Sequence, residues 1–125
     1  MNILLVDDNL LMQQVISRFL AGVGHTVACA DTAADAYALA AQRPFELLVI
    51  DLRLPDADGA DALADLRALP GYDGAPAIAI SGYGEEYARQ ARNDGFDAYL
   101  SKPIEFDALQ QAVEAYSGRA RALGR

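Results

Sequence analysis

The run Leu47-Leu48-Val49-Ile50-Asp51 is the stretch that decides the fold. Its first four residues are all apolar, without the alternation of a strand that has one face in water. A short unbroken run of this kind is typical of a parallel strand that helices cover on both faces. The run stops at an aspartate, so we expect a carboxylate at the carboxyl end of a central strand.

Strand-like runs and helical patterns alternate on either side of this segment. The five predicted strands are Ile3–Val6, Thr26–Ala30, Leu47–Asp51, Ala77–Ser81 and Ala98–Ser101. The five predicted helices are Leu10–Ala21, Ala33–Gln42, Ala60–Leu69, Glu85–Asp94 and Ile104–Tyr116. This regular alternation predicts an α/β fold: a (βα)5 doubly wound parallel five-stranded sheet with the flavodoxin-like strand order 2-1-3-4-5.

The length of 125 residues suits one domain, and an eight-fold barrel would need about twice as many. We expect the domain to span residues 1–118 and residues 119–125 to form a C-terminal tail or linker stub. The chain carries 18 acidic and 10 basic residues, for a net charge of −8. Nucleic-acid binding needs a basic face, so this domain is not expected to bind nucleic acid.

The composition also bears on the cellular compartment. No apolar run approaches the length of a membrane span, and the first residues enter a strand-like run without the basic region of a secretory signal. The single cysteine, Cys29, has no partner for an intramolecular disulfide. These features predict a cytoplasmic protein that is not associated with a membrane.

Polar side chains gather where the predicted strands end. The first strand is followed by Asp7 and Asp8, the third ends in Asp51, the fourth in Ser81, and the fifth is followed by Lys102, the only lysine. Ligands of doubly wound sheets bind beyond the carboxyl ends of the strands. We therefore expect these five side chains to form one site.

The charges at this edge predict a Mg²⁺ site. Neighbouring carboxylates repel one another unless a cation is present. Mg²⁺ takes a few carboxylates and keeps its other positions for water or phosphate oxygens, and the lack of nearby cysteine or histidine argues against zinc. Asp7 and Asp8 suit a metal platform. Asp51 faces them alone and can accept a phosphoryl group, with Lys102 and Ser81 binding the phosphoryl oxygens.

These motifs resemble those of the receiver domains of two-component response regulators, the CheY-like family. The matching segments are Leu5–Asn9, Asp51–Gly59, Ile80–Gly82 and Ala98–Pro103, and the resemblance covers about residues 2–116. It implies a phosphorylation switch rather than an enzyme in the ordinary sense. Such a domain takes a phosphoryl group from a histidine kinase or a histidine phosphotransfer domain and catalyses its own loss of phosphate.

The resemblance also implies a role for each residue. Asp51 would be the phosphoacceptor and a metal ligand, Asp8 a direct Mg²⁺ ligand, and Asp7 a ligand mainly through water. The backbone carbonyl of Arg53 would complete the protein ligands. Lys102 would pair with the phosphate and precede Pro103 through a cis peptide bond. Ser81 would be the switch hydroxyl, and Tyr99 the aromatic residue that turns inward with it, changing the surface between about Glu85 and Tyr116.

Four further residues border the expected site. Leu10 and Leu11 follow the acidic pair, and at least one of them is surplus to the core, so we expect an exposed apolar contact for a partner helix. Arg53 and Tyr83 each lie two residues beyond a site residue. We expect their side chains to restrict attacking water and to prolong the phosphorylated state. The only histidine, His25, is expected in a turn on the opposite edge of the sheet.

One alternative stays open within this family, and the sequence argues against two others. The domain could be a stand-alone regulator or the receiver module of a hybrid histidine kinase or larger regulator. A haloacid-dehalogenase-like phosphatase needs a second aspartate two residues after its nucleophile, where this chain has Arg53. A flavodoxin needs a phosphate-binding loop after the first strand, where this chain has Asp7, Asp8 and Asn9.

Overall fold

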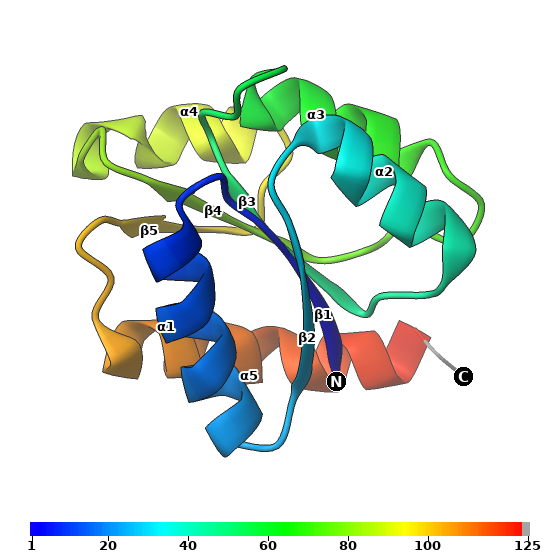
Figure 1. The fold of residues 1–125 in the computed structure, drawn as a ribbon, viewed down its shortest axis with the longest axis horizontal. Coiled ribbons are helices and arrows are strands. Elements are labelled where there is room, and N and C mark those ends of the chain that lie inside the picture. The colour runs from blue at the N-terminus through cyan, green and yellow to red at the C-terminus, as the bar shows by residue number, and fades with distance from the viewer. Residues whose placement is uncertain (124–125) are drawn as a thin grey trace.

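A computed structural model describes residues 1–123 of the chain, and the side chains of residues 1–117. It contains one sheet of five parallel strands in the order β2-β1-β3-β4-β5 (Figure 1). The strands are β1 Asn2–Val6, β2 Thr26–Ala30, β3 Leu47–Asp51, β4 Ala77–Ser81 and β5 Ala98–Ser101. The predicted fold and strand order are confirmed.

Helices cover both faces of this sheet, as Figure 1 shows. They are α1 Leu10–Gly22, α2 Ala33–Gln42, α3 Gly59–Arg67, the 3-10 turn η1 Glu85–Tyr87, α4 Ala88–Asn93 and α5 Phe106–Leu123. Helices α1 and α5 lie on one face, and α2, α3 and α4 lie on the other. The sheet therefore forms the middle of three layers.

The buried core is divided between the two faces of the sheet. Along β3, Leu48 and Ile50 pack with α2, α3 and α4, whereas Leu47 and Val49 pack with α1 and α5. All five residues of β3 are buried. An apolar run without alternation is thus explained, because each face of this strand meets a layer of helices.

Side-chain caps fix where two helices begin. The Asn9 side chain accepts a hydrogen bond from Met12 N, and the Thr32 side chain accepts one from Asp35 N. Each cap satisfies one backbone N–H that has no partner inside its helix. The first cap matters for the site, because it starts α1 directly after Asp7 and Asp8.

The largest differences from the predicted helix bounds are in α4 and α5. The segment expected as one helix, Glu85–Asp94, is a 3-10 turn followed by a six-residue α4. Gly84 precedes it with a φ of 93°, and only Ala91 of α4 is buried, so little packing favours a longer helix. Helix α5 begins at Phe106 and continues to Leu123, past the expected end at Tyr116 and into the segment predicted as a tail.

None of the helices within residues 1–123 is both long and apolar enough to cross a bilayer.

Candidate metal centre

The strand register brings the predicted site residues to one edge of the sheet. Val6 pairs with Ile50, so Asp7 follows β1 at the level of Asp51. Ser81 pairs with Ser101 at the ends of β4 and β5, so Lys102 follows directly. The peptide bond between Lys102 and Pro103 is cis. The site is thus assembled by strand pairing and not by long loops.

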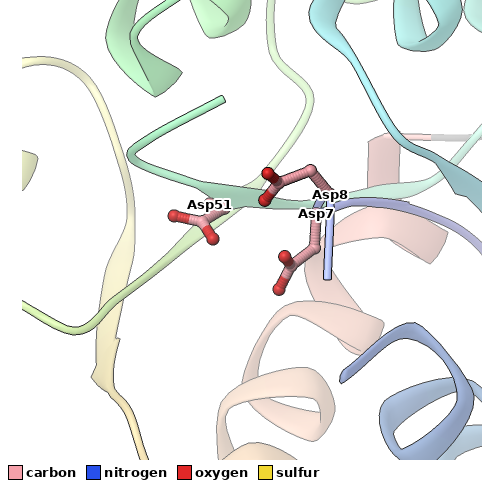
Figure 2. Close-up of side chains that lie close together, drawn as sticks. All are labelled: Asp7, Asp8 and Asp51. Atoms are coloured by element: carbon pink, nitrogen blue, oxygen red, sulfur yellow. The ribbon is translucent and has the colours of Figure 1, made fainter. Parts of the chain in front are cut away.

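Three carboxylates lie together at this edge (Figure 2). One oxygen from each of Asp7, Asp8 and Asp51 lies within 4.8 Å of the others. Asp7 is fully buried and Asp51 is 6% exposed, whereas Asp8 is open to solvent. Two of the three carboxylates are therefore buried, while the third can be reached by a second molecule from solvent.

Both oxygens of Asp51 have donors. Arg53 N donates to Asp51 Oδ1 at 2.9 Å, and Lys102 Nζ donates to Asp51 Oδ2 at 2.8 Å. A charged hydrogen bond and a backbone hydrogen bond together leave this carboxylate little rotational freedom. Asp51 is consequently held in one orientation before any ligand binds.

Only one of the two Asp7 carboxylate oxygens accepts a hydrogen bond within the described part of the chain. Asn9 N donates to Asp7 Oδ1 at 2.9 Å. The other oxygen, Asp7 Oδ2, is buried and accepts no hydrogen bond from any residue that the structure describes, although Lys102 Nζ lies 3.2 Å away as an ion-pair partner. Burial, together with the charge of Asp51, raises the pKa of Asp7. A bound cation would stabilise the ionised form of this buried carboxylate.

Lys102 supplies a single positive charge to this group. Burial acts to lower the pKa of Lys102, but the hydrogen bond and charge of Asp51, and the charge of Asp7, outweigh it and raise the pKa. The ammonium is therefore fixed as a cation between two carboxylates. One ammonium cannot neutralise three carboxylates, and a divalent ion would balance the remainder.

The donor set fits Mg²⁺. The three carboxylates offer the hard oxygen ligands that this ion takes, and the unsatisfied Asp7 Oδ2 is a buried atom in need of a cation. The carbonyl of Arg53, expected as a further ligand, belongs to a residue whose N–H is already bonded to Asp51. Cysteine and histidine, which zinc prefers, do not occur in this cluster.

The two residues expected to act as a switch lie on β4 and β5. Ser81 is buried, and its Oγ accepts a hydrogen bond from Tyr83 N at 3.0 Å. Tyr99 packs against the core on the α2, α3 and α4 face, and its hydroxyl donates to Gly84 O at 2.6 Å. Both contacts reach the β4–α4 loop, so this loop connects the hydroxyl to the tyrosine.

An aromatic stack borders the site. The Arg53 guanidinium lies over the Tyr83 ring, with 5.1 Å from its carbon to the ring centroid. Tyr83 in turn stacks on Tyr87 at a centroid distance of 4.6 Å. The two residues expected at the mouth of the pocket therefore contact each other.

His25, by contrast, contacts the terminal amine of Met1, at the amino end of the strands, away from the carboxylates.

Sequence reasoning missed Gln13, which supports the acidic cluster from behind. This side chain is 9% exposed, and its Nε2 donates to Asp7 O and to Asp31 Oδ1, each at 2.6 Å. The signal was present in the sequence: Gln13 shares the helical face of Ile16 and Leu20, where a polar residue is unexpected. A polar residue on an apolar face next to a site is a candidate support for that site.

Gly59 ends one of the matching segments, and the structure explains why a glycine stands there. A Cβ at this position would lie 2.6 Å from Asp51 O and 2.8 Å from Leu52 Cα. Only glycine fits so close to the end of β3. Gly59 therefore lets α3 begin directly behind Asp51.

Comparison with known proteins agrees with this geometry. The family described as response regulator receiver domain matches residues 3–114. The KDP operon transcriptional regulatory protein KdpE of Escherichia coli is 36% identical over 110 residues, which cover 87% of this chain and 48% of KdpE. The signal transduction histidine-protein kinase BarA of Escherichia coli is 30% identical over 117 residues, which cover 93% of this chain and 13% of BarA. The chain thus spans half or less of these two curated relatives.

A solved structure is also similar. It is the receiver domain of the sensor histidine kinase PA1611 of Pseudomonas aeruginosa, with a magnesium ion coordinated in its active site cleft. It is 30% identical, has a TM-score of 0.85, and the match covers 94% of this chain and 97% of that one. Sequence, fold and acidic edge lead to the same conclusion: the chain belongs to the family of response regulator receiver domains.

Proposed function

We propose that this domain accepts a phosphoryl group on Asp51, with Mg²⁺ bound beside it, from a phosphohistidine of a histidine kinase or histidine phosphotransfer domain. The observation that carries the proposal is the double pairing of Lys102, which lies 2.8 Å from Asp51 Oδ2 and 3.2 Å from Asp7 Oδ2. The ammonium joins the acceptor carboxylate to the metal platform, so both act on the same incoming group.

The transfer forms one bond and breaks one. An oxygen of Asp51 attacks the phosphorus, and the P–N bond to the imidazole of the donor breaks as the histidine leaves. Asp51 is oriented for this attack by the hydrogen bonds from Arg53 N and Lys102 Nζ. Lys102 is a compact cation that can stay with the phosphoryl oxygens as charge develops on them.

The metal would be held by Asp8 and Asp51, by the Arg53 carbonyl, and by Asp7 mainly through water. Mg²⁺ bound there would neutralise charge on the phosphoryl oxygens and on the carboxylates that face them. The open side next to Asp8 is where the donor would approach. The same pocket would admit water, so the domain would also catalyse its own dephosphorylation.

Ser81 and Tyr99 would transmit the effect of phosphorylation from Asp51 to the surface of the domain. The Ser81 hydroxyl accepts from Tyr83 N, which leaves its own proton free to bond a phosphoryl oxygen. Movement of Ser81 would shift the β4–α4 loop, to which Tyr99 is bonded at Gly84 O. Phosphorylation would thereby alter the surface formed by α4, β5 and α5.

The donor would dock on the start of α1. Leu10 and Leu11 are 63% and 69% exposed next to the acidic pair. Exposed leucines at this place suit a helix of the donor, which must bring its phosphohistidine to Asp51.

The relatives include both a transcriptional regulator and a histidine kinase, and the proposed transfer serves a stand-alone regulator and a module of a larger protein alike. We place the reaction in the cytoplasm, where a free Cys29 persists.

The test is phosphorylation by acetyl phosphate in the presence of Mg²⁺, followed by intact-mass measurement. We expect the mass to increase by one phosphoryl group, and we expect a chelator to prevent the increase. Asp51→Asn should remain unlabelled, whereas the exposed Asp73→Asn should be labelled like the natural chain. Labelling of the Asp51→Asn protein would refute the proposal.

A further inference from the structure

The loop between β3 and α3 is a small hairpin. Arg53 and Asp58 form an antiparallel bridge, and Leu54 N donates to Ala57 O at 3.1 Å. Asp56 lies in the tight turn at its tip. The hairpin is short and closed by its own backbone hydrogen bonds, so displacement of the tip moves its base as well.

The tip of the hairpin is bonded to a different helix. Asp56 Oδ1 accepts from Ala33 N at 2.9 Å, and Asp56 Oδ2 accepts from Ala34 N at 3.0 Å. These are backbone N–H groups at the start of α2, which have no partner within the helix. The two hydrogen bonds hold the pKa of Asp56 below its usual value. One carboxylate thus fastens the hairpin to α2 with both of its oxygens.

The base of the hairpin is bonded to the acceptor. Arg53, three residues before Asp56, donates its backbone N–H to Asp51 Oδ1 at 2.9 Å. Leu52 and Leu54 pack at the margin of the core, but Pro55 and Asp56 are exposed. Among the described residues, the contacts that fasten this exposed tip are therefore those from Asp56 to α2.

We infer that Asp56 is a positioning residue for phosphoryl acceptance at Asp51. It holds the hairpin against α2, and the hairpin in turn holds the N–H and the carbonyl of Arg53 beside Asp51. Loss of this anchor would loosen the Arg53 N–H···Asp51 bond and weaken Mg²⁺ binding through the Arg53 carbonyl. This inference rests on the proposed function, because it concerns the same acceptor and the same metal.

The chain offers a matched control in Thr32. Its Oγ accepts from Asp35 N at 3.0 Å and so caps the same helix, without belonging to the hairpin. Thr32→Ala and Asp56→Ala both remove a cap from α2, but only Asp56→Ala releases the hairpin. A purely structural role predicts the same consequences for the two substitutions.

The first measurement is amide hydrogen exchange of Arg53 in the metal-free protein. We expect exchange to become faster by about tenfold or more in Asp56→Ala and to stay within about twofold in Thr32→Ala. The second is Mg²⁺ affinity from an NMR titration, expected to weaken by about tenfold in Asp56→Ala only, as for other groups that orient metal ligands. Thr32→Ala should lower the melting temperature by about 4 °C without either change.

The third measurement is the rate of labelling by acetyl phosphate at saturating donor. It should fall in Asp56→Ala, fall less in Asp56→Asn, which keeps one acceptor oxygen, and persist in Thr32→Ala. Equal effects of Asp56→Ala and Thr32→Ala on Arg53 exchange and on Mg²⁺ affinity would overturn the inference, and Asp56→Asn decides the matter if Asp56→Ala does not fold. A natural chain that is never labelled would refute the proposed function, while Arg53 exchange would still decide the role of Asp56.

Discussion

Lys102 Nζ lies 2.8 Å from Asp51 Oδ2, although the two residues are 51 positions apart in the chain. The pairing follows from the order of the strands, because β3 and β5 flank β4 and end at the same edge. It joins the only lysine to the proposed acceptor. The lysine also contacts Asp7, so it is the central cation of the site.

Lys102→Ala should slow the phosphorylation of Asp51 by about a hundredfold or more, because it removes the charge that stabilises the transferring group. Lys102→Arg should recover only part of the rate, since a planar fork does not replace a compact ammonium between two carboxylates. Labelling by acetyl phosphate over time measures both. A Lys102→Ala protein that is labelled as fast as the natural chain would exclude this role.

Asp7→Asn should abolish the stabilisation of the protein by Mg²⁺. At an ion concentration ten times the dissociation constant, the natural chain should gain about 1.4 kcal/mol of unfolding free energy, and Asp7→Asn should gain little. Urea unfolding with and without Mg²⁺ measures the difference. Asp73→Asn, at an exposed position, is the control and should respond as the natural chain does.

The same substitution predicts a pH dependence in the metal-free protein. The pKa of Asp7 in the folded state is raised above 3.8, chiefly by burial, so folding disfavours its ionised form. The free energy of unfolding of the natural chain therefore falls as the pH rises from 3.8 through the folded-state pKa of Asp7. Asp7→Asn should therefore become more stable than the natural chain as the pH rises through this range. A stability difference that is independent of pH would contradict the assignment of a buried charge to Asp7.

The fold was predictable from the sequence because each strand is short, apolar and bounded by turn residues. Leu47–Asp51 identified a strand covered on both faces, and the residues after each strand gave the acidic cluster and Lys102. The short α4 was predicted too long, because a helical pattern of residues does not reveal how few of them the fold buries. Gln13 and Asp56 escaped prediction for a related reason: their partners, Asp31 and the start of α2, are neighbours only in the folded chain.

Arg53→Ala combined with Tyr83→Ala should shorten the lifetime of the phosphorylated state. The guanidinium and the ring contact each other, and we expect their removal to admit attacking water. We expect phosphate loss to become faster by about threefold or more, a modest change because only access is altered. Timed decay of the labelled protein measures it, with the exposed Arg89→Ala as a control. An unchanged rate would contradict the role.

Tyr99→Phe should uncouple the switch from the pocket while leaving phosphorylation intact. It removes the hydrogen bond from the hydroxyl to Gly84 O, at a cost of about 1 kcal/mol in stability. We expect the rate of labelling at Asp51 to stay within about twofold, because the hydroxyl that is removed bonds to Gly84 O in the β4–α4 loop. Amide chemical shifts of α4 and β5 should change less on phosphorylation than in the natural chain. Equal shifts would argue against Tyr99 as the switch residue.

The most direct test is a crystal structure of the protein with Mg²⁺ and beryllofluoride, which mimics a bound phosphoryl group. We predict beryllium bonded to an oxygen of Asp51, Lys102 Nζ within hydrogen-bond distance of a fluorine, and Mg²⁺ ligated by Asp8, Asp51 and the Arg53 carbonyl. Beryllofluoride bound away from Asp51, or Lys102 turned toward solvent, would contradict the account.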